Sequence, residues 1–476
     1  MVERLNGLDA AMLAGETPEW HMHSGSLMVF EPAPGHGDDF AANLRRVLNA
    51  RRSELGVFTH RLAEVPLGLG RPVWYDADSE DLGRRVHRVA LPAPGGPREL
   101  AGLAADLFST QLNRSGPLWE IWVIEGLHNG QVAMLVKMHH SLIDGVRGAR
   151  LLEVLYDIQP DAPVVRAHAP AVVGELPPSV AAMAVEAGRF LATTPIRVLR
   201  FAAGLVPVAA RLGWLFGSSA GRSAALPFRA PRTSMNRALT PERAFAFASV
   251  RLEDLRVVKE AFAVTMNDVA LAVCADAMRR YLVDRDELPD RSLVAAIPVG
   301  VRRDAPARGG NFVSATGTSL HTDVDDPVSR LHAIHDSMAS GKKMQQAIGD
   351  ELVIDALAVL PPAALRMGLG VYRGLRLAEI HPPVFNAIIS NVRGPAFPLY
   401  SCGAQLVAAY TFGPLLMGCG CNITLVSYRD HVDFGVVTCP DVIAEPWRIA
   451  DAIPEALSAL VRRADAPAGA PVSRSG

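Results

Sequence analysis

A run of residues suited to acid–base chemistry lies at positions 139 to 145 of this 476-residue chain, where His139 and His140 are followed after three residues by Asp144 and Gly145. Histidine is the usual general base for a hydroxyl that attacks a carbonyl carbon, because its pKa lies near neutral. His140 fits that role in acyl transfer from a thioester. Asp144 could order the turn by accepting hydrogen bonds, and Gly145 permits a close backbone approach. A bare histidine pair is explained as often by metal binding or core packing, whereas the whole pattern at a strand end is more specific.

Two β-rich segments, residues 120–127 and 131–138, precede the histidines and are joined by His128, Asn129 and Gly130. The Asn-Gly pair is among the strongest short signals of a β-hairpin. Residues 145–158 follow with apolar side chains close to helical spacing. The sequence therefore predicts that a hairpin strand delivers the histidines to a strand-to-helix junction, which is a common place for chemistry.

Length and charge narrow the class of protein. A chain of 476 residues exceeds the size at which one core usually stops growing, so two domains are expected. Lys and Arg number 47 against 49 Asp and Glu, and the net charge of -2 gives no general attraction to nucleic acid. The N-terminus has no apolar stretch after a basic region, so no secretory signal is predicted and a cytoplasmic location is expected.

The five cysteines are an odd number in a long chain without an export signal, which favours free thiols over a disulfide framework. Cys419 and Cys421 form the only close pair. No second cysteine pair or histidine cluster completes four ligands, so the sequence predicts buried thiols and no metal site.

The pattern of segments predicts a mixed α/β (α+β) fold. Residues 1–160 form an N-terminal unit, residues 161–242 a linker that is first Pro-rich and then helical, residues 243–463 a second unit, and residues 464–476 a disordered tail. In the second unit, residues 245–252, 292–298, 384–390, 422–428 and 431–438 are strand-like, and residues 267–282 and 446–461 are helix-like.

The linker region 179–216 is Ala- and Leu-rich, and Pro195 and Pro207 are expected to break it into short helices. Its longest uncharged piece, between Arg200 and Arg211, has ten residues, where about twenty are needed to span a bilayer. Four arginines against one glutamate on an apolar background could mark helices that lie on an anionic lipid surface. The alternative is that these helices pack the two units together.

The motif resembles that of the CoA-dependent acyltransferase superfamily, which includes chloramphenicol acetyltransferase and the condensation domains of peptide synthetases. Over nearly its full length the chain is similar to the bacterial wax ester synthase/diacylglycerol acyltransferase family. The matching pieces lie at residues 5–9, 22–23, 117–120, 139–145, 266–272, 298–302, 310–311, 389–392 and 422–424. The resemblance implies two chloramphenicol-acetyltransferase-like domains, each a mixed sheet flanked by helices, joined by a helical crossover linker.

The resemblance also implies roles for individual residues. His140 would be the base, His139 would support it, and Asp144 would be mainly structural. The residues expected to bind substrate are Gly145, Asn267, Asp268, Arg302, Ser390 and Asn391. For Asn267 the alternative is that it only caps its helix.

Three positions depart from the family's usual pattern, namely Gly300, Arg393 and Asn113. None of them is the predicted base. They bear on acceptor preference and catalytic rate.

The resemblance implies an acyl-CoA-dependent O-acyltransferase that makes triacylglycerol from diacylglycerol, wax ester from a long-chain alcohol, or both. Acyl-CoA is then a co-substrate, no cofactor is needed, and local arginines such as Arg232, Arg243 or Arg302 would meet the CoA phosphates. We expect peripheral association with the inner face of the membrane or with lipid inclusions. The alternatives are condensation of an activated acyl group with another acceptor, and a catalytically weak protein that binds lipid surfaces.

Overall fold

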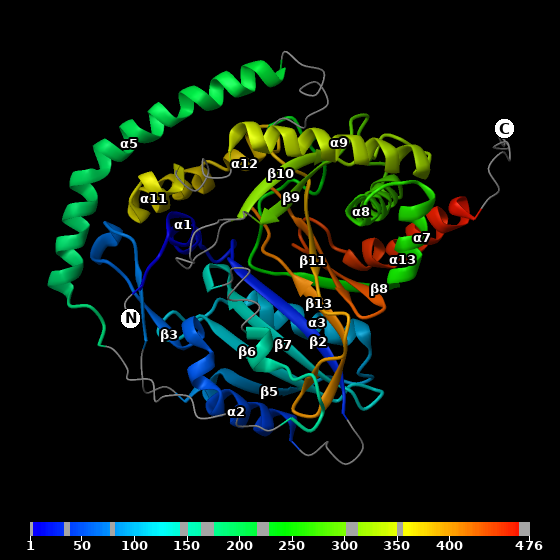
Figure 1. Cartoon of the computed structure of the whole chain (residues 1–476), viewed down its shortest axis with the longest axis horizontal. Helices are drawn as coiled ribbons and strands as arrows, with labels where there is room; N and C mark the ends of the chain where they lie inside the picture. The colour runs from blue at the N-terminus through cyan, green and yellow to red at the C-terminus, as the bar shows by residue number, and fades with distance from the viewer. Residues whose placement is uncertain are drawn as a thin grey trace.

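The computed structural model describes residues 3–32, 39–76, 81–142, 151–162, 176–216, 228–300, 313–349 and 356–465. Within these ranges the chain forms two mixed six-stranded sheets and one small sheet of three strands, with helices around them. Figure 1 shows the N-terminal strands gathered in one half of the molecule and most of the C-terminal strands in the other. The architecture is the mixed α/β fold that the sequence predicts.

The first sheet has the strand order β12-β13-β2-β7-β6-β5. β6 and β7 form the predicted hairpin, and Gly130 in its turn takes a positive φ of 77°. All neighbours are antiparallel except β5 and β6. The strands span Tyr400–Ser401 (β12), Ala404–Phe412 (β13), His23–Glu31 (β2), Val132–His139 (β7), Trp119–Glu125 (β6) and Val86–Ala90 (β5).

The second sheet has the order β10-β9-β11-β14-β15-β8. β11 is parallel to both of its neighbours and the other pairs are antiparallel. The strands span Val313–Ser319 (β10), Val294–Gly300 (β9), Ala387–Arg393 (β11), Cys421–Tyr428 (β14), His431–Thr438 (β15) and Ala244–Arg251 (β8). Five of them agree with the strands expected from the sequence to within a few residues, and β10 was not expected.

One strand pair departs from the predicted division of the chain, because β12 and β13 complete the sheet of the N-terminal half. A Cβ added at Gly435 would clash with the carbonyl oxygen of Thr411 on β13. The glycine therefore permits the close approach of the two strands. Buried Asp433 accepts hydrogen bonds from the Ala409 amide (2.7 Å) and the Ser249 hydroxyl (2.6 Å). Periodicity predicts a strand but not its partner. The domain boundaries predicted at residues 160 and 243 stay predictions.

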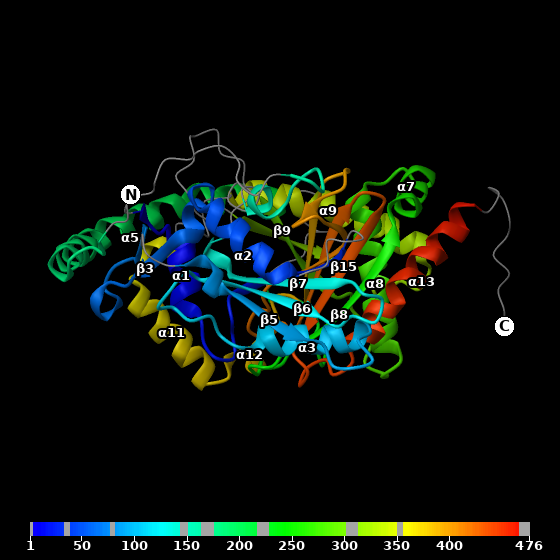
Figure 2. The ribbon, with the colours of Figure 1, turned by 90° about the horizontal axis from the view of Figure 1, so that it is seen from below.

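The two halves also share a hydrophobic core. Phe108 of α3 meets Phe245 of β8 edge to face at 5.1 Å between ring centroids, and Phe245 stacks on Phe412 of β13 at 3.9 Å. α2 packs on the opposite face of the first sheet from α3, as Figure 2 shows. The helices of the first half span Gly7–Gly15 (α1), Phe40–Ala50 (α2) and Pro97–Ser109 (α3).

Helices of the second half cover its sheet, and α8 is the most buried of them. Thr265 caps its first turn by accepting from the Asp268 amide, while the Asp268 carboxylate accepts from the Thr265 amide at 2.9 Å. The helices span Leu252–Ala261 (α7), Met266–Val283 (α8), Pro327–Ile348 (α9), Pro362–Gly374 (α11), Leu377–Ile380 (α12) and Pro446–Ala464 (α13).

The small sheet and several short 3₁₀ helices flank the first sheet. The sheet has the order β1-β4-β3, from Glu3–Arg4 (β1), Val73–Asp76 (β4) and His60–Ala63 (β3). The 3₁₀ helices span Arg52–Glu54 (η1), Gly56–Thr59 (η2), Pro66–Gly68 (η3), Leu82–Arg85 (η4) and His140–Leu142 (η5).

The linker differs from the sequence prediction, because one helix, α5 (Val180–Phe216), runs through both Pro195 and Pro207. Proline removes one backbone donor and crowds the preceding turn. Just before Pro195, the hydroxyls of Thr193 and Thr194 donate to the carbonyls of Arg189 and Phe190 at 2.9 and 2.8 Å. The expectation of short helices is therefore wrong. Figure 1 shows α5 arching around the outside of the molecule.

All five cysteines are free thiols, and four of them are buried. Within the described ranges no group of histidine, cysteine and carboxylate side chains is arranged to hold a metal ion.

In the same ranges α5 contains one stretch, Val180–Trp214, that is long and apolar enough to cross a membrane by length and composition alone.

Candidate active site

Pairing of β2 with β7 brings the predicted base into a cluster of histidines. His23 lies directly opposite His139 in this antiparallel pair, and the main-chain amide of His140 donates to the carbonyl of Met22 at 2.7 Å. His140 opens η5 immediately after the strand. The strand end therefore fixes the backbone of both motif histidines.

His140 is partly exposed, whereas His139 is only 1% exposed. The Nδ1 atom of His140 lies 2.6 Å from the Ser24 hydroxyl oxygen. Burial lowers the pKa of His140 to about 4, so its imidazole is neutral at pH 7. The neutral ring can accept a proton, and its lowered pKa makes it a weaker base than an ordinary histidine.

His139 points to the other side of the strand and holds the turn that follows. Its Nδ1 accepts from the Ser141 amide at 3.1 Å and lies 2.7 Å from the Ser141 hydroxyl. An accepting Nδ1 assigns the proton of the neutral ring to Nε2, which lies 3.9 Å from an oxygen of Glu16. Burial lowers the pKa of His139 to about 3. This geometry suits a residue that supports its neighbour.

Glu16 is a buried carboxylate of this cluster that the sequence did not point to. Its side chain is 4% exposed and lies 3.3 Å from Nε2 of His23 and 2.7 Å from Nη2 of Arg114. Burial alone would raise the pKa of Glu16. The hydrogen bond from His23, the field of His139 and the bond from Arg114 outweigh it and lower that pKa to about 2. Only its proximity in sequence to residues 22–23 could have signalled it.

A second group of predicted residues meets where α8 begins beside β11. The Asn391 side-chain amide donates to Oδ1 of Asn267 at 3.4 Å, and Ser390 precedes Asn391 on β11. Asp268 accepts at 2.7 Å from Nδ1 of His335, a residue of α9. The helix is capped by Thr265, so capping does not explain Asn267. His335 carried no signal in the sequence.

Two family descriptions match the chain. The wax ester synthase/diacylglycerol acyltransferase catalytic domain matches residues 5–270, and the C-terminal domain of the same family matches residues 309–461. The chain belongs to this family. It is an acyltransferase, and the resemblance and enzyme class expected from the sequence are confirmed.

Relatives of this acyltransferase match it over nearly its whole length. Two Mycobacterium tuberculosis proteins named as diacylglycerol O-acyltransferases are 37% identical over 463 residues (96% of this chain, 99% of the relative) and 34% identical over 465 residues (98% and 91%). The structure of a wax ester synthase/diacylglycerol acyltransferase from Marinobacter aquaeolei is 30% identical, with a TM-score of 0.69, and covers 97% of this chain and 99% of its own.

Condensation domains share the fold at lower identity. The starter condensation domain of rhizomide synthetase, solved in complex with a CoA derivative, is 14% identical, with a TM-score of 0.53 over 97% of this chain and 94% of its own. The predicted two-part condensation-like fold is confirmed by these likenesses.

Two of the arginines considered for the CoA phosphates donate hydrogen bonds to main-chain carbonyl oxygens of the acyltransferase. Arg243 is 5% exposed and donates to the carbonyls of Thr240, Glu242 and Glu19 at 2.5, 2.8 and 2.7 Å. Arg232 donates to the carbonyl of Asn236 at 3.3 Å and also to that of His381. Arg243 is therefore a structural residue. Arg302 lies outside the described residues, as do Asp144 and Gly145.

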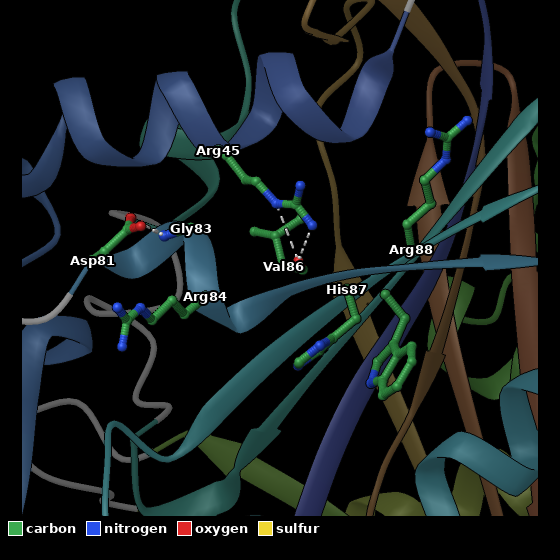
Figure 3. Close-up of a pocket in the computed structure, with 8 residues that line it drawn as sticks. Arg45, Asp81, Gly83, Arg84, Val86, His87 and Arg88 are labelled. Atoms are coloured by element: carbon green, nitrogen blue, oxygen red, sulfur yellow. Dashed lines mark hydrogen bonds between the residues drawn. The ribbon is translucent and has the colours of Figure 1, made fainter.

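A surface hollow of about 650 Å³ lies elsewhere, at the outer edge of the first sheet beside β5 (Figure 3). Three of its charged side chains, Arg45, Asp81 and Arg88, are engaged with neighbours. Arg45 donates to the carbonyl of Val86 at 2.8 Å, and Arg88 pairs with Glu125 at 2.6 Å. None of the described motif residues lines this hollow, so we do not assign the reaction to it.

Proposed function

We propose that the protein transfers a long-chain acyl group from acyl-CoA to the hydroxyl of diacylglycerol or of a long-chain alcohol, with His140 as the general base. The substrates follow from the names of its relatives, which match over at least 91% of their own length. The observation that carries the base is the placement of His140, which is partly exposed, neutral and anchored at the end of β7.

In the proposed reaction the acceptor oxygen attacks the thioester carbonyl carbon while its proton passes to Nε2 of His140. The tetrahedral intermediate collapses, the carbon–sulfur bond breaks, and the Nε2 proton passes to the CoA sulfur. The products are an ester and free CoA, and the imidazole is neutral again. One positioned base typically contributes about two to four orders of magnitude to such a step.

The other motif residues have supporting roles in this proposal. His139 holds the turn through Ser141, and Asp144 is mainly structural. Asn267, Asp268, Ser390 and Asn391, together with Gly145 and Arg302, bind substrate. The bond between Asn267 and Asn391 supports a shared role for that group, because it joins α8 to β11 at the two conspicuous polar motifs.

We also propose that the protein docks on an anionic lipid surface through α5, because both acceptors reside in lipid. Apolar side chains on this helix are widely exposed, including Leu199 at 69%, Val206 at 69% and Trp214 at 78%. Arg200 and Arg211 are exposed among them. Exposed apolar groups and arginines on one helix suit shallow insertion assisted by charge. A location at the inner membrane face or on lipid inclusions follows from this proposal.

The substrate class is tested by incubating the purified full chain with palmitoyl-CoA and one of three acceptors. The acceptors are dioleoylglycerol, hexadecanol and hexadecylamine. Ester formation with either hydroxyl acceptor at a rate well above thioester hydrolysis is expected. Amide formation alone would favour the condensation alternative, and no product with any acceptor would favour a catalytically weak lipid-binding protein.

A further inference from the structure

The hydroxyl of Ser24 makes a short contact with the side chain of the proposed base. Its oxygen lies 2.6 Å from Nδ1 of His140. Met22 faces His140 across the β2–β7 pair and accepts its amide, and Ser24 is two residues further along β2. Ser24 is thus the diagonal neighbour of His140 on one face of the sheet, which is a position from which side chains can touch.

We propose that Ser24 is a positioning residue that accepts a hydrogen bond from Nδ1–H of His140 and so selects the tautomer with its lone pair on Nε2. This proposal rests on the proposed role of His140 as the base. A hydroxyl can accept from Nδ1–H or donate to an unprotonated Nδ1, so the contact fits either tautomer, and the role of His140 as the base requires that Ser24 accept. A neutral imidazole carries one ring proton, so the protonation of one nitrogen decides the state of the other. With the proton on Nδ1, Nε2 is the nitrogen able to accept the proton of the acceptor hydroxyl.

A hydroxyl performs this task differently from a carboxylate. The Ser24 oxygen accepts from Nδ1–H both in the neutral ring and in the imidazolium formed during transfer, and it adds no charge beside the base. The buried carboxylate of the cluster, Glu16, is engaged with His23 and Arg114 and faces His139. Ser24 therefore orients His140, while the charged network stabilises the strand behind it.

Kinetics of three variants test the proposal. Ser24→Ala should lower kcat about three- to tenfold, the worth of one hydrogen bond, with KM changed less than about twofold. Ser24→Thr keeps the hydroxyl and should restore most of kcat. Ser26→Ala is the matched control, because Ser26 lies two residues further on the same strand and bonds the Thr411 hydroxyl at 2.9 Å instead. An unchanged kcat in a folded Ser24→Ala protein would overturn the proposal.

The tautomer supplies a readout that a merely structural role would not move. In protein labelled with ¹⁵N-histidine, the His140 signals, identified by their loss in His140→Gln, should show Nδ1 protonated at pH 7. Ser24→Ala should shift the ring toward the Nε2–H form and Ser26→Ala should not. A wild-type His140 protonated on Nε2 would reject the role of Ser24. Failure of the base itself would appear instead as normal turnover by His140→Ala, with the tautomer result unaffected.

Discussion

Nε2 of His23 lies 3.3 Å from Oε1 of Glu16, inside the protein and directly behind the strand end that bears His139 and His140. The same carboxylate binds Arg114, which also donates to the carbonyl of Leu13 at the end of α1. An ionised carboxylate is tolerated at this depth because the Arg114 guanidinium compensates its charge. The network links α1 to β2 and to the segment after α3.

Replacing Glu16 with glutamine should lower the free energy of unfolding by about 1–3 kcal/mol, because Arg114 loses its buried partner. The midpoint of urea denaturation at pH 7 measures the change. Glu186→Gln is the matched control, since its pair with Arg4 lies at the surface and should leave the midpoint where it is. Equal midpoints for wild type and Glu16→Gln would show that the network does not stabilise the fold.

Stability should fall as the pH drops below about 6.5, the ordinary pKa of histidine. Burial holds the pKa values of His21 and His139 at about 3 in the folded protein, so below pH 6.5 the unfolded chain binds protons that the folded chain does not. The stabilisation is therefore complete above pH 6.5 and is lost progressively toward pH 3. Melting temperatures between pH 7.5 and 4.5 check this.

The comparison with His21→Gln isolates one of these groups, and the exposed residue His332 supplies the control variant His332→Ala. His21→Gln should make the melting temperature depend less steeply on pH, while His332→Ala should leave the slope unchanged. A slope as steep in His21→Gln as in wild type would mean that His21 is not held neutral in the fold.

Two substitutions at the start of α8 should separate stability from substrate binding. Thr265→Ala removes the cap and should cost about 1 kcal/mol of stability with little effect on KM. Asn267→Ala leaves the cap intact and should reduce kcat/KM about tenfold with an unchanged melting temperature, as expected for one lost substrate hydrogen bond. A destabilised Asn267→Ala protein with normal kcat/KM would make Asn267 a structural residue.

The lipid-surface proposal predicts that the double variant Arg200→Glu/Arg211→Glu binds anionic vesicles more weakly. Arg189 and Arg197 are poorer choices, because the first pairs with Glu186 and the second lies over the Phe190 ring. Each exposed arginine should contribute about 1 kcal/mol, screened within about 8 Å at physiological salt. Sedimentation with phosphatidylglycerol/phosphatidylcholine vesicles at low and high salt measures the effect.

The matched control for vesicle binding places the same charge change at the other end of the molecule, as Arg251→Glu/Arg462→Glu, just before α7 and on α13 (Figure 1). This control should sediment like wild type. If both double variants bind equally well, α5 does not contact the lipid.

The sequence predicts local structure and the motif well, because both depend on neighbouring residues. The Asn129-Gly130 turn, the strand ending at His139 and the helix after Thr265 all follow from spacing and turn chemistry. It could not predict that β13 joins the N-terminal sheet, because strand periodicity names no partner. Glu16 and Ser24 were equally hidden, since neither lies near His140 in sequence. The β2–β7 register brings Ser24 to His140, and Glu16 reaches His139 from the end of α1. The continuous α5 was missed because proline usually ends a helix, whereas this helix runs through both Pro195 and Pro207.

In the proposed mechanism His140 takes the proton of the acceptor hydroxyl, so the turnover number of His140→Ala shows how much of the rate depends on that proton transfer. Measured with palmitoyl-CoA and the better hydroxyl acceptor, kcat should fall by about two to four orders of magnitude. The melting temperature should stay close to that of wild type, and His332→Ala should retain full activity. A folded His140→Ala protein that turns over at a near-normal rate would contradict the assignment of His140 as the base.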